Sequence, residues 1–397
     1  MLQRGCKMKV LYLSHLCSTK EYERMFRVFG TTTSHAAQKF HRLMVEGLRE
    51  NECAVDVLTQ RILARYVETE LTRPQESEDG ICYTYLPCTK GKNWNCLNTI
   101  VSAFKKICEW HKKYPDGVVI CDTILGEMSL ALWLASRFYH IKTVGLVTDV
   151  PSIFAGETRT GFKAIPFKIK NAIIYSYKSY IFLTEQMNQI LNPHHRPYVV
   201  IEGIVDRHVV DIPNTLKGKY SNKVCIMAGQ LEKFFGVDML IQAFRQINCP
   251  DAELRFYGYG TSVETIKAAE KIDPRIHFCG QLTNEQMVQE ERCATLMINP
   301  RTPEGKWTVY SFPSKNMEYI ASGTPMLANK LPCIPDEYLP YFYYPEEPSH
   351  FTQKLQEVLQ CDQATLHVKG LEAQSWIVRT KNAKEQVRKL SEMLQTL

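Results

Sequence analysis

The segment NPRTPEGKWTVYSFPSKNMEYIASGTPMLA, residues Asn299–Ala328, decides the fold. It follows an apolar run typical of a buried strand, and its polar loop leads to Pro313, a residue tolerated at the start of a helix. Gly323 is placed to end that helix. A helix that begins at the carboxyl end of a parallel strand lies where open α/β sheets bind ligands, and its dipole favours a phosphate. Lys315 adds positive charge, and Glu318 is placed to accept hydrogen bonds from a ribose diol; a capped helix with Glu318 in solvent is the alternative.

Short β-rich runs alternate with helical patterns on both sides of this segment, which predicts parallel sheets built from βαβ units. The expected strands are Lys9–His15, Cys53–Thr59, Gly117–Asp122, Ile141–Asp149, Ser179–Thr184, Pro197–Gly203, Lys223–Gly229, Ala252–Gly258, Ile276–Gly280 and Leu296–Pro300. The expected helices are Ser34–Glu50, Met128–Phe138, Val237–Ile247, Ser262–Lys271 and Glu285–Glu291. The fold class is therefore α/β, with two similar Rossmann-like halves.

Chain length indicates two domains, because 397 residues exceed what a single hydrophobic core usually organises. The composition, 45% hydrophobic and 23% charged, is that of an ordinary globular protein that folds throughout. We expect one domain over residues 1–205 and a second over 206–372, with a polar, irregular linker near 205–220. Residues 373–397 read as charged amphipathic helices that pack back toward the N-terminal domain.

The cysteines indicate a cytoplasmic location. All 14 are scattered without a C-x-x-C pair, and no signal peptide or apolar run of membrane-spanning length is present. We expect a reducing compartment, no structural zinc and no nucleic-acid partner.

Lysines and aromatic residues cluster at residues 162–180, in FKAIPFKIKNAIIYSYKSY. One interpretation is a solvated surface with extended lysine side chains. The other is a peripheral contact with anionic lipid at the inner face of the cytoplasmic membrane, where each lysine contributes about 1 kcal/mol of attraction.

Several familiar active-site patterns are absent from the sequence, which lacks G-x-G-x-x-G, G-x-x-x-x-G-K-[ST], G-x-S-x-G, H-E-x-x-H and D-x-D. Dehydrogenase, P-loop and zinc-hydrolase functions lose their support. Without D-x-D, a diphosphate has no paired carboxylates to hold it through a divalent ion, so amides and cations must bind it instead.

The second half resembles the donor domain of glycosyltransferase family 4, which has the GT-B fold of two facing Rossmann-like domains. Gly229-Gln230-Leu231, Gly236-Val237 and the helix through Phe244 resemble that family's G-x-L…G-V…L-I-x-A-F segment. YGYG, with Gly258 and Gly260, resembles its strand-end G-x-G, and FCGQLTNEQM resembles the segment near the base. The resemblance covers nearly the whole chain and implies an N-terminal domain that binds the acceptor and a C-terminal domain that binds the donor.

A closer resemblance is to the bacterial subgroup that builds capsular, exo- and O-antigen polysaccharides. It is carried by INPR, YSFPSKNMEY and LPCIPDEY in the second half, and by LVTDVPS, FLTEQM and VIEGIVD in the first. The resemblance implies a hexosyltransferase-type enzyme that is retaining and metal-independent and has no cofactor. It implies a UDP- or GDP-sugar donor, with UDP favoured, and a saccharide or lipid-linked saccharide acceptor.

The chain departs from the wider family at the diphosphate and sugar contacts. Gln230 and Phe235 stand where many members carry an Arg and a Lys, and Tyr310 stands where the first of two paired glutamates falls. Lys315, then Arg301, then Lys233 are the candidate replacement cations. Glu304 is a sugar-binding candidate. The donor-binding candidates are Gly229, Gln230, Lys233, Gly258, Tyr310, Ser311, Phe312, Ser314 and Glu318.

In the first half, Asp149 ends a strand where relatives carry a polar or His residue that faces the donor sugar. It is a catalytic candidate together with Lys315 and Arg301, and a turn Asp before Pro151 is the alternative. The connection from His15 to Ser34 is long, and long loops are often functional. His15, Thr33 and Glu185 are therefore acceptor-side candidates.

Two other function classes stay open. A GT-B epimerase or phosphorylase shares the architecture. A non-catalytic scaffold in a polysaccharide assembly complex fits the altered positions Gln230, Phe235 and Tyr310. Binding and release of a nucleoside diphosphate separate a transferase from a scaffold.

Overall fold

The structure, a computed structural model, describes residues 7–29, 35–61, 72–89, 91–150 and 165–397. The chain forms two compact units: unit 1 comprises Met1–Ile204 and Ala383–Leu397, and unit 2 comprises Val205–Asn382. The C-terminal boundary differs from the expectation at residue 373, because the helix Gln363–Thr380 runs through that position without a break and stays with unit 2. All 13 cysteines among the described residues are free thiols.

Unit 1 is built around an eight-stranded sheet in the order β3-β4-β2-β1-β5-β6-β7-β8, in which every pair except β3–β4 is parallel. Its strands are β1 Lys9–Ser14, β2 Ala54–Thr59, β3 Glu76–Glu78, β4 Ile81–Tyr85, β5 Val118–Asp122, β6 Lys142–Val147, β7 Ser179–Phe182 and β8 Tyr198–Val200. Its helices are α1 Thr19–Phe29, α2 His35–Glu50, α3 Lys92–Lys113, α4 Gly126–Phe138, α6 Ile165–Tyr175, α7 Glu185–Leu191 and α14 Ala383–Gln395.

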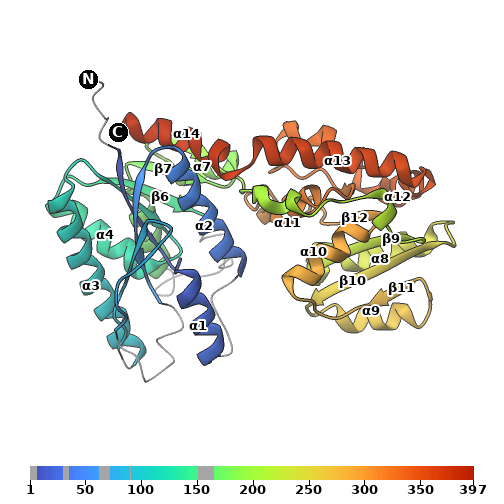
Figure 1. Cartoon of the computed structure of the whole chain (residues 1–397), viewed down its shortest axis with the longest axis horizontal. Helices are drawn as coiled ribbons and strands as arrows, with labels where there is room; N and C mark the ends of the chain where they lie inside the picture. The colour runs from blue at the N-terminus through green and yellow to red at the C-terminus, as the bar shows by residue number, and fades with distance from the viewer. Residues whose placement is uncertain (1–6, 30–34, 62–71, 90, 151–164) are drawn as a thin grey trace. The chain divides into compact units, whose positions relative to one another are not determined.

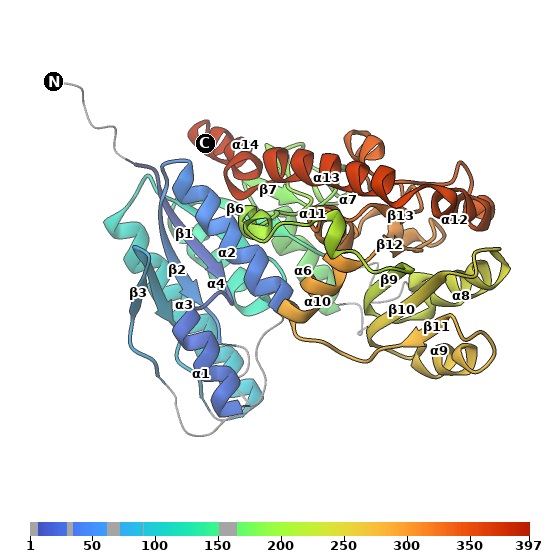
Figure 2. The ribbon, with the colours of Figure 1, turned by 45° about the vertical axis from the view of Figure 1, so that its right-hand side comes forward.

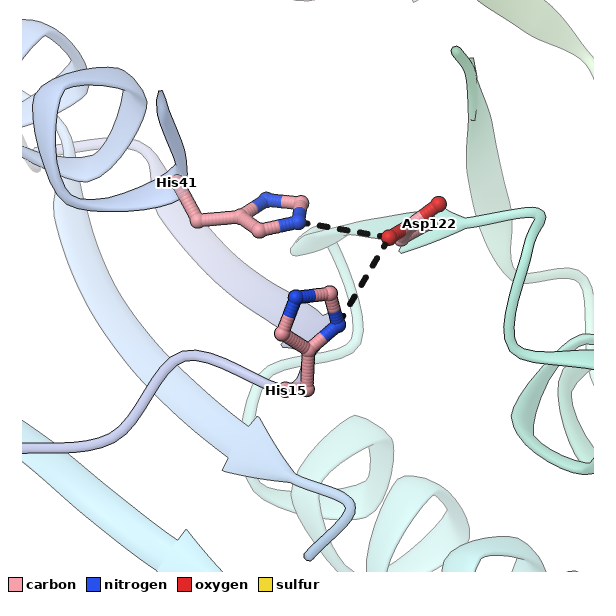
Figure 3. A group of neighbouring side chains, drawn as sticks. All are labelled: His15, His41 and Asp122. Carbon is pink, nitrogen blue, oxygen red and sulfur yellow. Dashed lines mark ion pairs between the residues drawn. The ribbon is translucent and has the colours of Figure 1, made fainter. Parts of the chain in front are cut away.

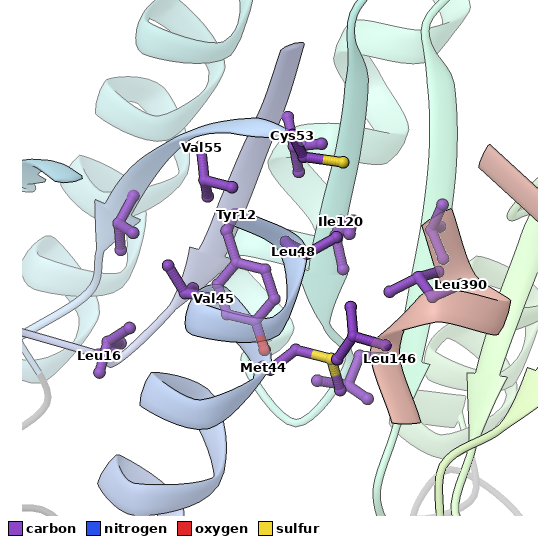
Figure 4. Packing of buried hydrophobic residues seen from close by; sticks show 14 of the residues in the cluster. Tyr12, Leu16, Met44, Val45, Leu48, Cys53, Val55, Ile120, Leu146 and Leu390 are labelled. Carbon is purple, nitrogen blue, oxygen red and sulfur yellow. The ribbon is translucent and has the colours of Figure 1, made fainter. Parts of the chain in front are cut away.

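Helices cover both faces of this sheet, as the nearly continuous apolar character of its central strands requires. α2 and α14 lie side by side on one face, and α3 and α4 pack together on the other (Figure 1). The core under α2 includes Tyr12, Met44 and Ile120, and α14 contributes Leu390 to it (Figure 4). The last helix of the chain is therefore part of the core of unit 1.

One expectation for unit 1 is wrong. Residues His15 to Ser34 were expected to form one long loop, but the helix α1 occupies Thr19–Phe29. It is amphipathic in a way that is hard to see in the sequence, because TKEYERMFRVF is rich in charge and buries few side chains, among them Met25 and Glu21. Glu21 is fully buried there through ion pairs with Arg24 and Arg73.

Unit 2 holds a five-stranded parallel sheet in the order β11-β10-β9-β12-β13. Its strands are β9 Lys223–Gln230, β10 Ala252–Tyr259, β11 Ile276–Phe278, β12 Leu296–Asn299 and β13 Met326–Ala328. Its α-helices are α8 Val237–Gln246, α9 Val263–Glu270, α10 Asn284–Cys293, α11 Ser314–Ala321, α12 Phe351–Gln360 and α13 Gln363–Thr380. Short 3₁₀ helices cover Arg207–Asp211, Leu216–Gly218, Lys233–Phe235, Lys306–Val309, Asp336–Tyr341 and Pro348–His350.

The side chains of each strand point alternately to the two faces of the unit 2 sheet, and each face forms a hydrophobic core. On β9, Cys225 and Met227 face the core formed with α8, α9 and α12, whereas Val224 and Ile226 face the core formed with α11 and α13. Successive side chains of a strand point to opposite faces, so one apolar run supplies both cores. Figure 2 shows β9 and β10 next to α8. The described helices therefore cover both faces of the sheet.

Candidate functional site

Two glycines open the carboxyl edge of the unit 2 sheet. Gly229 at the end of β9 and Gly258 at the end of β10 are register partners with φ of 122° and 136°. A Cβ on Gly258 would lie 1.8 Å from the carbonyl oxygen of Gly229, so no other residue fits there. These strand ends therefore present backbone without side chains.

Lys315, in the first turn of α11, extends over this edge. A Cβ on Gly229 would lie 3.2 Å from Lys315 Cε, and Lys315 Nζ forms an ion pair with Glu318 Oε2 at 2.5 Å. Burial alone would lower the pKa of Lys315, but the adjacent Glu318 carboxylate outweighs it and raises the pKa above its ordinary value. Lys315 is therefore a permanent cation beside the backbone of β9.

Arg301 supplies a second cation just beyond the end of β12. It is only 4% exposed, and its guanidinium stacks 3.8 Å from the ring centroid of Trp307. Asn329 holds the loop by donating to the backbone oxygens of Pro300 and Arg301. Burial lowers the pKa of Arg301 to about 10. Its Nε and Nη2 are buried and have no acceptor among the described residues, which leaves two directed donors for an anionic ligand.

The other predicted donor residues lie around this edge with different exposure. Phe312 is buried and packs against Tyr338, while Ser311 accepts a hydrogen bond from Cys333 through its backbone oxygen at 3.4 Å. Tyr310 is half-buried. Ser314, Gln230 and Glu304 are exposed. Lys233 is 84% exposed and lies 3.9 Å from Asp238, which makes it a surface lysine.

A second group of polar residues lies at the carboxyl edge of the unit 1 sheet. His15 follows β1, Asp122 ends β5 and His41 comes from α2 (Figure 3). His41 Nε2 lies 3.2 Å from Asp122 Oδ2, and His15 Nδ1 lies 4.0 Å from the same oxygen. Burial, and then His41, lower the pKa of His15 to about 4 against the opposing effect of Asp122. We call these three residues the triad.

Sequence reasoning identified only His15 of the triad. His41 and Asp122 carry no motif spacing, because the sheet brings together residues that are far apart in the chain. The position of Asp122 at the end of a buried strand was the only signal available, since carboxyl ends of parallel strands share one edge.

The remaining acceptor-side candidates are placed as follows. Asp149 follows β6, and part of its surface is exposed. Partial burial of the carboxyl raises the pKa of Asp149, and the nearby Asp122 raises it further. Glu185 begins α7, is exposed and accepts a hydrogen bond from Tyr198 Oη at 2.5 Å. Thr33 lies outside the described residues. In the cluster 162–180, residues 162–164 lie outside them too, whereas Lys168 and Lys178 are exposed.

No helix in the described parts of the chain is long and apolar enough to cross a bilayer.

Solved structures with the same architecture span almost the entire chain. Sucrose-phosphate synthase from Thermosynechococcus elongatus is 14% identical, with a TM-score of 0.64 and 98% coverage of both chains. Anabaena HepE in complex with UDP and glucose is 12% identical, with a TM-score of 0.62 over 98% of this chain and 100% of that one. The lipopolysaccharide outer core galactosyltransferase WaaB is 14% identical, with a TM-score of 0.63 over 98% and 99%. These likenesses confirm the expected GT-B fold.

Among sequences, residues 222–361 match the family described as "Glycosyl transferases group 1". No curated protein sequence matches the chain. The matched range contains the whole unit 2 edge, with Gly229, Gly258, Arg301, Lys315 and Glu318. A match to glycosyltransferase group 1 over residues 222–361, within a chain of the GT-B fold, identifies the protein as a glycosyltransferase.

Proposed function

We propose that this enzyme transfers a hexose from a nucleotide-sugar, with UDP as the favoured nucleotide, to a saccharide or lipid-linked saccharide acceptor. The observation that carries the proposal is the pair of cations at the unit 2 edge. Lys315 lies over the end of β9, and the buried Arg301 presents two unpartnered donors beyond the end of the neighbouring strand β12. A diphosphate satisfies both, because phosphate oxygens accept directed hydrogen bonds from cationic groups.

The proposed chemistry breaks the bond between the sugar's anomeric carbon and the diphosphate, and forms a bond from that carbon to an acceptor oxygen, which loses its proton. Lys315 and Arg301 offset the negative charge that grows on the departing diphosphate. Glu318 accepts hydrogen bonds from the ribose, and Asp149 of unit 1 orients the acceptor hydroxyl. The donor needs no metal in this scheme, since protein cations neutralise the phosphates. Retention of anomeric configuration follows from the family resemblance.

Neighbouring structures support the choice of nucleotide and pathway. HepE was solved with UDP and with UDP-glucose, and WaaB is a lipopolysaccharide galactosyltransferase. We extend this to a cytoplasmic role in capsule or other surface polysaccharide synthesis. In that role the exposed lysines at 168 and 178 contact the membrane that carries a lipid-linked acceptor.

Calorimetric titration with UDP, GDP and ADP in the presence of a chelator tests the proposal. We expect UDP to bind, and Glu318→Ala to weaken its binding about tenfold to a hundredfold, the value of one or more hydrogen bonds to a charged group. Glu264→Ala is a matched control, because it also removes a carboxylate paired three residues away, with Lys267 on α9. If no nucleotide binds, the proposal is wrong and the scaffold function takes its place.

A further inference from the structure

The triad of unit 1 has the ligand chemistry of a cation site. His15 Nδ1, His41 Nε2 and Asp122 Oδ2 all lie within 4.8 Å of one another, and Figure 3 shows the two rings directed at the carboxylate. Zinc bonds of about 2.0–2.2 Å at tetrahedral angles place ligand atoms about 3.3 Å apart. The His41–Asp122 separation of 3.2 Å already meets this requirement. His15 Nδ1 lies 4.0 Å from Asp122 Oδ2 and has to approach this oxygen by less than about 1 Å, together with an adjustment toward His41, for an ion to be shared.

Neighbouring groups fix each ligand in the orientation that an ion needs. Tyr12 Oη lies 2.7 Å from His41 Nδ1, which directs Nε2 of that ring toward Asp122. The backbone N–H of Ile124 donates to Asp122 Oδ1 at 3.1 Å, so the other carboxylate oxygen faces the histidines. Gln38, from the same helix as His41, donates to the backbone oxygen of His15 at 2.6 Å. Such outer partners set the tautomer and the ring orientation at metal sites.

Among the described residues, protein partners leave one buried atom of the triad unsatisfied. The side chains of His15, His41 and Asp122 are 9%, 3% and 1% exposed. Within the described ranges, Asp122 has ion-pair contacts only with the two histidines, and His15 Nδ1 is a buried atom without a hydrogen-bond partner. The contacts of His41 with Tyr12 and Asp122 leave His15 Nδ1 unsatisfied. A divalent cation satisfies all three groups at once.

We propose that the triad binds one divalent transition-metal ion of the Zn²⁺ class through His15 Nδ1, His41 Nε2 and Asp122 Oδ2. Two imidazoles and one carboxylate suit zinc and its neighbours, whereas Mg²⁺ and Ca²⁺ prefer oxygen ligands throughout. Three protein ligands leave a fourth position for water or for an oxygen of a small molecule, as in zinc sites with an open position. The site is formed by unit 1 residues alone and is separate from the residues proposed to hold the donor diphosphate.

Metal titration of the full chain, stripped with a chelator and desalted, tests this proposal at near-neutral pH. Zn²⁺ is followed by calorimetry and Co²⁺ by the visible absorption of its tetrahedral complex. We expect one ion per chain for each metal and none for Mg²⁺. Asp122→Asn and His15→Gln should each weaken this binding more than about a hundredfold, beyond the effect of losing an outer partner. Tyr12→Phe, which keeps the ring and removes only the hydroxyl, should weaken it about tenfold to a hundredfold.

Two controls separate the site from other metal ligands of the chain. His140→Gln removes an exposed histidine of the same unit and should leave binding unchanged. Thermal unfolding of each metal-free variant shows whether it is folded, and Tyr12→Phe keeps the test valid if a ligand variant unfolds. Absence of stoichiometric binding in the native chain would overturn the proposal. Equal binding by the native, Asp122→Asn and His15→Gln proteins would also overturn it, because thiols elsewhere would then hold the ion.

Discussion

At the scale of single residues, Lys315 and Glu318 form one ion pair but have different proposed partners in the donor. Lys315 Nζ and Glu318 Oε2 are 2.5 Å apart, and both side chains keep about two fifths of their surface exposed. Lys315 faces the backbone of β9, where a phosphate would bind, whereas Glu318 lies one turn further along the helix. The pair can therefore be separated by ligands that contain or lack phosphate.

We predict that Lys315→Met weakens binding of UDP about tenfold to a hundredfold, because it removes a charge-assisted hydrogen bond to the diphosphate. Binding of uridine should change little, since uridine has no phosphate. Calorimetry with both ligands measures this difference. Lys267→Met is the control, because Lys267 is paired with Glu264 at the same three-residue spacing. Equal losses for UDP and uridine would show that Lys315 acts by shaping the site rather than by binding phosphate.

At the scale of elements, a half-buried lysine connects the start of unit 2 to its sheet. Lys219 donates to the backbone oxygen of Ala294, before β12, and to Thr324 Oγ1, before β13, both at 2.8 Å. Burial lowers the pKa of Lys219 to about 7, against a smaller opposing effect of Cys293. Unfolding returns this pKa to its ordinary value of about 10.4. Between these two values the unfolded chain binds more protons than the folded chain, so folding is favoured as pH rises.

The prediction is that the stabilising contribution of Lys219 is complete above about pH 10 and is lost as pH falls toward 7. Thiols also titrate in this window, with the opposite sign where burial raises their pKa, so the native slope alone does not isolate Lys219. Denaturant unfolding of native protein and Lys219→Met from pH 7 to 9 isolates it. The native protein should gain stability relative to the variant as pH rises. Parallel curves for the two proteins would contradict the prediction.

Elements with a regular apolar pattern could be predicted from the sequence, and those held by distant partners could not. β9 was predicted because one apolar run supplies both faces of a buried strand. α1 was missed because its sequence, TKEYERMFRVF, is rich in charge and one of its few buried side chains is Glu21, which forms ion pairs with Arg24 and Arg73. The candidate residues at the unit 2 edge could be predicted because they lie in short continuous segments of the sequence. His41 and Asp122 are far apart in the sequence, and only the arrangement of β1, β5 and α2 in the structure shows that they lie together.

At the scale of the whole molecule, the chain passes between the units twice, and its last helix belongs to the first unit. Val205 donates to the backbone oxygen of Lys381 at 2.8 Å, so the two passages run next to each other on the unit 2 side. Beyond them, α14 packs on α2 so closely that a Cβ on Gly47 would lie 2.4 Å from the backbone oxygen of Ala383. Leu390 on α14 is fully buried in the unit 1 core. Residues at the end of the chain are thus required to complete a domain formed at its beginning.

This arrangement predicts that Leu390→Ala destabilises unit 1 by about 2–5 kcal/mol, the usual effect of removing a buried leucine side chain, and leaves unit 2 unchanged. Amide hydrogen exchange resolves the two units, because protection of a strand reports the free energy of opening its own unit. Exchange should accelerate in β1, β2 and β5 but not in β9, β10 and β12. Glu392→Ala is the control, since Glu392 is exposed and paired with Arg388 at the surface. Equal acceleration in both sheets would mean instead that the units unfold together and that α14 stabilises the entire chain.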